Sequence, residues 1–316
     1  MRVRFGYVAI ALGVPEGSPN KTTTAKALEK IADREGRIGR LRRLMSANLE
    51  TTLRILRYNA AHEVALYRFT SKTVPLATHP LATDWDYIAD GQPLWREIGD
   101  YVKLHGMRVS AHPDHYTLLN SPKPEVLAAS LSDLDYHARM FEAMGLPPSP
   151  SLVLHVGGQY REKAAALRRF AERFAALPGR LAARLMVEND DKIFTAAEVL
   201  ALCEELGRPM VLDIHHHRCN GGGELAELWP RIAATWGGAT PKVHVSSPKS
   251  SKDIRAHADY VAPEDLLPFL RLARETGRDL DVMVEAKMKD EAMFRLVAGL
   301  AAAPGVRRAG LAAVEL

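Results

Sequence analysis

The feature that most constrains the fold of this sequence is an eightfold alternation between short apolar runs and longer amphipathic stretches. The runs are typical of strands buried on both faces of a sheet, whereas the stretches repeat apolar residues at helical spacing. The predicted strands are Val3–Val8, Val64–Phe69, Met107–Ala111, Ser151–Val156, Arg184–Val187, Pro209–Leu212, Lys242–Val245 and Asp281–Val284. The predicted helices include Ser46–His62, Pro93–His105, Pro124–Gly145, Lys163–Leu177, Ala196–Leu206, Leu225–Trp236, Glu264–Glu275 and Asp290–Ala302.

Eight βα units predict an α/β fold of one closed (β/α)8 TIM barrel over residues 1–316, with an open doubly wound sheet as the alternative. No low-complexity tract, sequence repeat or long linker divides the chain. No GxGxxG motif follows the first predicted strand, so the sequence does not favour dinucleotide binding. We therefore expect a single domain.

Composition indicates which cellular compartment and which partners to expect. The chain has 42 Lys and Arg against 38 Asp and Glu, a small positive excess that fits a polyanionic partner without requiring one. Its two cysteines, Cys203 and Cys219, lack CxxC spacing, which argues against a disulfide framework and a thiolate zinc site. No apolar run is long enough to cross a bilayer, and the first residues are more typical of a strand than of a signal peptide. We expect a cytoplasmic protein that is not inserted in a membrane.

Residues of metal-binding types gather where the predicted strands end. A barrel brings the C-terminal ends of all its strands to one face, and barrel enzymes carry their active sites on that face. Side chains that follow different strands are therefore expected to converge. The nine candidate ligands are His79, His112, His155, Glu188, Asp213, His216, His244, His257 and Glu285.

A set of imidazole and carboxylate ligands suits Mn²⁺, Zn²⁺ or Fe²⁺. Because one ion needs roughly four to six ligands, nine candidates predict two or three clustered ions. Such clusters suit phosphodiester hydrolysis, in which one ion activates water and another steadies the leaving oxygen. The alternative for any single His is a hydrogen-bonded structural role, which we favour for His62, His105 and His137 in or at the ends of predicted helices.

Strand periodicity refines two of these assignments. His215, His216 and His217 cannot all face inward while side chains alternate along a strand, so only one or two of them can be ligands. The same period places Lys242 and His244 on one face, and Lys242 is therefore expected to point into the site. As an ammonium it would attract a phosphate, and a neutral or carbamylated form could ligate metal. The alternative is an ordinary cation at the end of a strand.

Nine sequence blocks carry a more specific likeness. They are, in order, RFGYVA, LYRFTSKTVPLATHP, VSAHPDHYTLLNSP, LVLHVGG, MVENDDK, LDIHHH, PKVHVSSPKS, IRAHADYV and MVEAKMKD. In order and spacing, across essentially the whole chain, these blocks resemble the ultraviolet damage endonuclease family.

The resemblance implies a barrel similar to those of endonuclease IV and the xylose isomerase-like enzymes, with a cluster of two or three Mn²⁺ ions. Zn²⁺, Co²⁺ or Mg²⁺ are the alternative ions. It implies a hydrolase that acts on damaged double-stranded DNA as a monomer. Such an enzyme nicks the phosphodiester bond immediately 5′ to cyclobutane pyrimidine dimers, 6-4 photoproducts and some abasic sites, leaving a 3′-hydroxyl.

The resemblance also assigns roles to individual residues. The nine positions above become the metal ligands, and Lys242, Glu188 and Glu285 become the catalytic residues. Our mechanistic hypothesis is that the two glutamates bridge metals, while Lys242 stabilises the leaving 3′-oxygen. Tyr7 is expected near the damaged nucleotides, and His115 and Tyr116 are expected to probe the duplex at the lesion.

Two positions depart from the family pattern. His115 stands where the family usually has Gln, and Ala11 stands near a position that tends to be Asn. A His can still wedge into a base stack and donate a hydrogen bond, so we expect probing to survive. The loss of an Asn amide removes one polar contact and affects the expected lesion preference or affinity.

Two other functions fit parts of the pattern. A divalent-metal sugar isomerase or epimerase would place similar ligands in a barrel mouth, because fold alone does not determine function. A catalytically inactive protein that binds damaged DNA would keep the probing loop but lose the metal chemistry. The complete ligand set argues against this second alternative.

Overall fold

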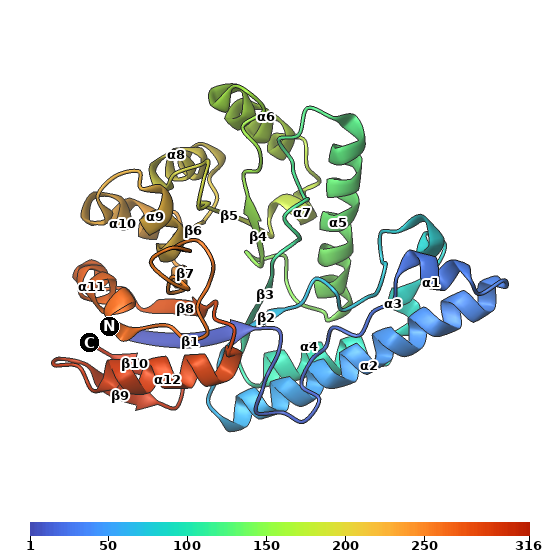
Figure 1. Cartoon of the computed structure of the whole chain (residues 1–316), viewed down its shortest axis with the longest axis horizontal. Helices are drawn as coiled ribbons and strands as arrows, with labels where there is room; N and C mark the ends of the chain where they lie inside the picture. The colour runs from blue at the N-terminus through green and yellow to red at the C-terminus, as the bar shows by residue number, and fades with distance from the viewer.

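Eight parallel strands close into a barrel in the computed structural model of the chain, which describes all residues 1–316 (Figure 1). Neighbouring strands pair in chain order, and β1 pairs with both β2 and β8, so the sheet has no open ends within the barrel. This closure confirms the barrel and excludes the open doubly wound sheet. The barrel strands are β1 (Arg2–Val8), β2 (Leu66–Phe69), β3 (Arg108–Ala111), β4 (Leu152–His155), β5 (Leu185–Glu188), β6 (Met210–Asp213), β7 (Lys242–Val245) and β8 (Leu280–Val284).

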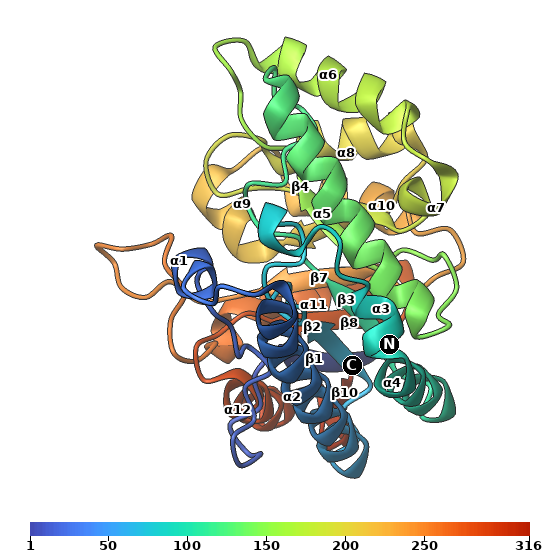
Figure 2. The same cartoon turned by 90° about the vertical axis from the view of Figure 1, so that its right-hand side faces the viewer.

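Helices surround the barrel and bury their apolar sides against its outer face (Figure 2). None of them is long and apolar enough to span a membrane. The α-helices are α1 (Ala25–Glu29), α2 (Arg34–Ala61), α3 (Tyr87–Asp90), α4 (Gln92–Leu104), α5 (Pro124–Ala143), α6 (Lys163–Ala175), α7 (Gly179–Ala182), α8 (Ala196–Leu206), α9 (Ile214–Asn220), α10 (Leu225–Ala234), α11 (Pro263–Ala273) and α12 (Lys289–Ala301). Two short 3-10 helices, η1 (Pro80–Ala82) and η2 (Arg274–Thr276), complete the set.

Close strand pairing explains one glycine at the seam of the barrel. Gly6 in β1 is paired with Leu66 in β2, and a Cβ atom at position 6 would lie 2.3 Å from the Leu66 carbonyl oxygen. Any larger residue would therefore push β1 and β2 apart. The glycine therefore allows β2 to pair closely with β1 where the barrel closes.

Helix α2 is longer than the sequence pattern predicts, since it begins at Arg34 rather than at Ser46. The side chain of Asp33 caps its first turn by accepting a hydrogen bond from a backbone N–H. In the additional turns, Leu41 and Met45 are buried at helical spacing. The many arginines between these apolar residues hid the periodicity in the sequence.

Helix α9 and a C-terminal hairpin are among the elements that were not predicted. The segment that contains the three consecutive histidines forms helix α9, which starts directly after β6, so strand alternation does not apply to it. A hairpin of β9 (Arg307–Gly310) and β10 (Ala313–Glu315) adds antiparallel to the first residues of β1. Strand β9 is short and begins with two arginines, and β10 has only three residues, so neither gives an apolar alternation long enough to predict it.

A layer of charged side chains closes the barrel interior near the N-terminal ends of its strands. The carboxylate of Asp281, which is fully buried, accepts hydrogen bonds from Arg4 Nε at 2.8 Å and from Arg108 Nη1 at 2.6 Å. Lys242 is also fully buried, and its Nζ has no hydrogen-bond partner. Burial and the positive charges of Arg108, Arg68 and Arg4 hold the pKa of Lys242 well below its ordinary value, although Asp281 opposes them. We call this layer of Arg4, Arg108, Lys242 and Asp281 the barrel floor.

Candidate metal centre and DNA-binding mouth

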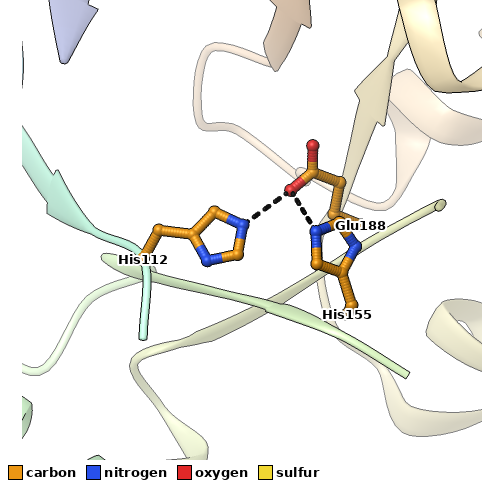
Figure 3. A group of neighbouring side chains, drawn as sticks. All are labelled: His112, His155 and Glu188. Carbon is orange, nitrogen blue, oxygen red and sulfur yellow. Dashed lines mark hydrogen bonds and ion pairs between the residues drawn. The ribbon is translucent and has the colours of Figure 1, made fainter. Parts of the chain in front are cut away.

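Glu188, the last residue of β5, lies at the centre of a first group of potential ligands. His112, directly after β3, and His155, at the end of β4, point their Nε2 atoms toward the same carboxylate oxygen of Glu188, Oε2 (Figure 3). The distances are 3.2 Å from His112 and 3.7 Å from His155. Three adjacent strand ends thus present two imidazoles and one carboxylate to a common point.

Glu188 also belongs to a second group, on the β6–β8 side of the mouth. Its ligand atoms lie within 4.8 Å of those of Asp213, His244 and Glu285. His244 Nδ1 is 2.7 Å from Glu188 Oε1 and 3.2 Å from Glu285 Oε1. Asp213 Oδ2 is buried and has no hydrogen-bond partner, as expected for an oxygen that serves as a metal ligand. The donors of both groups therefore fit divalent ions.

The histidines of α9 point in different directions and have different contacts. His216 Nδ1 lies 3.7 Å from Asp213 Oδ2 and 3.8 Å from Glu188 Oε1, which brings His216 to both groups. The ring of His257 is 6.4 Å from that of His216, at the outer side of the cluster. His215 is buried, and its Nε2 contacts the Arg255 carbonyl. Of the three consecutive histidines, His216 is thus the one that lies near carboxylates of the cluster.

His79 is a predicted ligand that the structure places in neither group. It caps the short helix η1, and its Nδ1 accepts a hydrogen bond from the Leu81 N–H at 3.2 Å. It lines a separate hollow together with Tyr116 and Tyr136. The loop after β2 is long, so its sequence position did not determine where the imidazole lies.

Opposite charges set the protonation of the cluster. Burial alone would raise the pKa of Glu188, but His244, His155 and the hydrogen bond from His112 hold it well below its ordinary value. Burial likewise opposes ionisation of Glu285, whose pKa is lowered by Arg68 and His244. Asp213 behaves differently: burial and the neighbouring carboxylates raise its pKa. Two carboxylates are thus held ionised, as ligands for cations must be.

Two histidines of the cluster have pKa values shifted in opposite directions. Burial lowers the pKa of His155 to about 4, whereas the carboxylates of Asp213 and Glu188 outweigh burial and raise that of His216 to about 9. Because an unfolded His titrates near 6.5, His155 reduces folding stability as pH falls from about 6.5 to about 4. The stabilisation from His216 is complete below about 6.5 and is lost as pH rises toward about 9.

We expect urea unfolding in EDTA to reveal the contribution of His216 to the pH dependence of folding stability. Wild-type protein should lose stability relative to His216→Gln between pH values of about 6.5 and 9. The difference between the two proteins should be constant below that window. An equal pH dependence of the two unfolding midpoints across the window would contradict the assignment.

Sequence reasoning missed Arg68, which lies within the cluster. It is the third residue of β2, is 5% exposed, and donates from Nη2 to Glu285 and, at 3.1 Å, to His244 Nε2. A charged residue inside an otherwise apolar strand, on the same face as Leu66, was the available signal. Lys242 and His244 do share the interior face as predicted, but Lys242 begins β7 and belongs to the barrel floor.

The loop after β3 forms a ridge between two hollows in the mouth, and we call residues 112–116 the ridge. On one side a cavity of about 490 Å³ reaches Asp190, Lys192 and His216. On the other, a cavity of about 360 Å³ reaches Ile10, Asn20 and the Arg68–Lys72 segment. His112 to His115 and His155 line both cavities. The ridge is thus positioned to separate two groups that enter the mouth from opposite sides.

The predicted probing residues lie on this ridge. Tyr116 is 60% exposed, and His115 is also exposed, with their rings packed edge to face at 4.9 Å between centroids. The Tyr116 hydroxyl donates to Asp114 Oδ2 at 2.5 Å, which fixes the orientation of the ring. An exposed aromatic side chain held in one orientation is suited to stacking against a base.

Two other sequence predictions concern residues that are buried. Tyr7 is fully buried, and its hydroxyl donates to Asn59 Oδ1 at 2.5 Å, so the structure gives it no surface to present to DNA. Ala11 is 1% exposed and lines neither mouth hollow. The smaller hollow instead contains Asn20, whose Oδ1 is buried without a hydrogen-bond partner. An amide is therefore present on that side of the mouth, although Ala11 lacks one.

Comparison with known proteins decides the family. The sequence model of the UV-endonuclease UvdE family matches residues 3–316. A curated relative from Bacillus pumilus (strain SAFR-032), named UV DNA damage endonuclease, is 45% identical over 319 residues, covering 100% of this chain and 99% of its own. The chain belongs to the UV DNA damage endonuclease family. The family predicted from the nine sequence blocks is thus confirmed.

Solved structures agree with this family assignment. The crystal structure of SacUVDE matches with a TM-score of 0.82 and 30% identity, covering 92% of this chain and 95% of that one. Endonuclease IV from Thermus thermophilus matches with a TM-score of 0.53 and 18% identity, covering 80% and 95%. At that identity the second likeness concerns the barrel alone, and it confirms the predicted fold similarity.

Proposed function

We propose that this UV DNA damage endonuclease family member nicks damaged double-stranded DNA immediately 5′ to UV photoproducts, and also at abasic sites, leaving a 3′-hydroxyl. Family membership makes it a hydrolase of DNA phosphodiester bonds. The observation that carries the proposal is the position of Glu188, which belongs to both groups of potential metal ligands at the mouth. A single anion between two such groups is suited to holding two divalent ions close together.

We propose Mn²⁺ as the ion, held by His112, His155, Glu188, Asp213, His216, His244 and Glu285, with His257 at the outer side of the cluster. Bound divalent ions would supply Lewis-acid stabilisation of negative charge on the phosphate. His79 could join these ligands only if the loop after β2 moved. Because Lys242 is fully buried in the barrel floor, we propose that it acts from beneath the ligands rather than by contact with DNA.

The ridge would supply lesion recognition. Damaged steps stack and pair poorly, so displacing them costs less of the few kcal/mol that extrusion of an intact base requires. His115 and Tyr116 are exposed beside the cluster and could fill the space that a displaced step leaves. The hollows on the two sides of the ridge offer room for displaced groups.

We expect the double substitution His115→Ala with Tyr116→Ala to reduce lesion selectivity. Loss of stacking worth about 1–3 kcal/mol per base should lower kcat/KM for a photodimer duplex roughly tenfold to a hundredfold. Metal content and melting temperature should not change, because both side chains are exposed. Incision of the photodimer duplex by the double variant at the wild-type rate would show that the ridge does not contribute to lesion recognition.

The decisive experiment is incision of an end-labelled duplex that carries one defined photodimer, beside an undamaged duplex. We expect cutting immediately 5′ of the dimer with Mn²⁺ and none in EDTA. Binding to the damaged duplex without cutting, by protein loaded with metal, would support the inactive damage-binding alternative. Neither binding nor cutting, together with Mn²⁺-dependent ketose conversion, would support the sugar isomerase alternative.

A further inference from the structure

Another cavity lies at the opposite end of the barrel from the metal centre. It has a volume of about 460 Å³ and lies between the C-terminal ends of α4 and α5 and the starts of β1 and β3. These two helices contact each other, and Figure 2 shows one end of α5 next to α4. Its wall is apolar at Val109, Phe141 and Leu146. Proposed catalysis at the mouth uses none of these residues.

The same cavity has an excess of positive charge. Arg4, Lys103 and Arg108 line it, whereas no Asp or Glu does. Asp281 in the barrel floor is the one carboxylate that pairs with the two guanidinium groups, and it is fully buried behind them. Lys103 contacts Asp100 on the exposed helix surface. One buried negative charge therefore faces the positive charges of two partly buried arginines, and a bound anion would neutralise the remaining positive charge.

Hydrogen-bond donors remain free in this cavity. Arg4 uses Nε and Nη2 on Asp281, which leaves Nη1 without a protein acceptor. Arg108 uses only Nη1, on Asp281 and on the Thr240 carbonyl, and its planar guanidinium group lies over the Trp236 ring at 4.9 Å. The hydroxyl of Ser151, a residue 4% exposed, is buried at the cavity without a partner. Buried polar groups normally have partners, so the unpaired Ser151 hydroxyl, beside guanidinium donors that no protein group uses, indicates a ligand.

We propose that this cavity binds a small organic anion whose apolar body packs on Val109, Phe141 and Leu146. Its carboxylate, sulfonate or phosphate group accepts hydrogen bonds from Arg4 and Arg108, with the Ser151 hydroxyl nearby. Each of these groups presents a pair of acceptor oxygens that matches the fork of guanidinium donors. The cavity, at about 460 Å³, lies within the range of small-molecule sites.

The test uses the full chain in EDTA and the fluorescent anion 8-anilinonaphthalene-1-sulfonate. We expect saturable binding to one site, competition by benzoate, and no competition by benzyl alcohol, which has a similar apolar body without the charge. Lys103→Glu reverses a charge at the cavity rim on an exposed side chain, so folding should be preserved. It should raise the dissociation constant about tenfold, equivalent to about 1.4 kcal/mol.

Two further variants make the test specific. Lys252→Glu is the matched control, because it makes the same charge change on an exposed loop outside this cavity, and it should leave the dissociation constant unchanged. Arg4→Lys keeps a cation for Asp281 but removes the free guanidinium donor, and it should also weaken binding. Absence of binding, equal affinity of all variants, or competition by benzyl alcohol as strong as that by benzoate would overturn the proposal.

Discussion

Replacing Glu188 with Gln is expected to reduce incision of a photodimer duplex by roughly a thousandfold. Gln keeps the size of the side chain but removes the negative charge that both ligand groups share. The imidazoles of His112, His155 and His244 would then face an uncharged amide. We expect loss of bound Mn²⁺ together with loss of turnover, because no other carboxylate belongs to both groups.

Single-turnover incision, with metal content measured on the same protein, checks this prediction. Glu205→Gln is the matched control, since Glu205 is an exposed residue of helix α8 on the outside of the barrel. Circular dichroism would show whether the Glu188→Gln protein is folded. If a folded Glu188→Gln protein cut the duplex at the wild-type rate, the assignment of the metal centre would be wrong.

The second large effect is expected on stability rather than on catalysis. Asp281→Asn should lower the free energy of unfolding by about 3 kcal/mol, because it removes a fully buried carboxylate that is the shared counter-ion of two partly buried arginines. Arg4 and Arg108 both donate to this carboxylate, and Lys242 lies in the same layer. The two arginines would then repel each other without the carboxylate that lies between them.

Urea unfolding in EDTA measures this effect apart from metal binding. Asp279→Asn is the control, because Asp279 is exposed and accepts one hydrogen bond from the backbone N–H of Arg2, which Asn can also accept. That variant should remain within about 0.5 kcal/mol of wild type. A similar, small change for both variants would show that the barrel floor does not depend on the Asp281 charge.

The barrel could be predicted from sequence because each barrel strand is a short apolar run that stands apart from the amphipathic stretches around it. Glu188 and Asp213 end their strands, and the parallel sheet then brings them together whatever the loops do. Helix α8 was also predictable, since Thr195 and Glu198 form a capping box and Gly207 ends it in the left-handed conformation.

Residues outside the strands were less predictable, for identifiable reasons. His79 lies in a long loop, where distance along the chain does not fix distance in space. The buried hydroxyl of Tyr7 donates a hydrogen bond to Asn59, a residue of α2. The two residues are far apart in the sequence, so no local pattern predicts this contact. Arg68 was overlooked because arginine is rare in barrel interiors, and its role depends on Glu285 at the other end of the chain.

The pairing of β1 with β8 also governs the order in which the chain can fold during synthesis. Arg4 and Asp281 are separated by 277 positions, so this contact waits until nearly all of the chain has left the ribosome. Until then β1 and β7 each keep an unpaired edge, a condition that favours aggregation. Glu285 follows β8 directly. The segment from Leu280 to Glu285 therefore closes the barrel, supplies the carboxylate of the barrel floor and completes the metal centre. A nascent chain that lacks this segment cannot form the complete site.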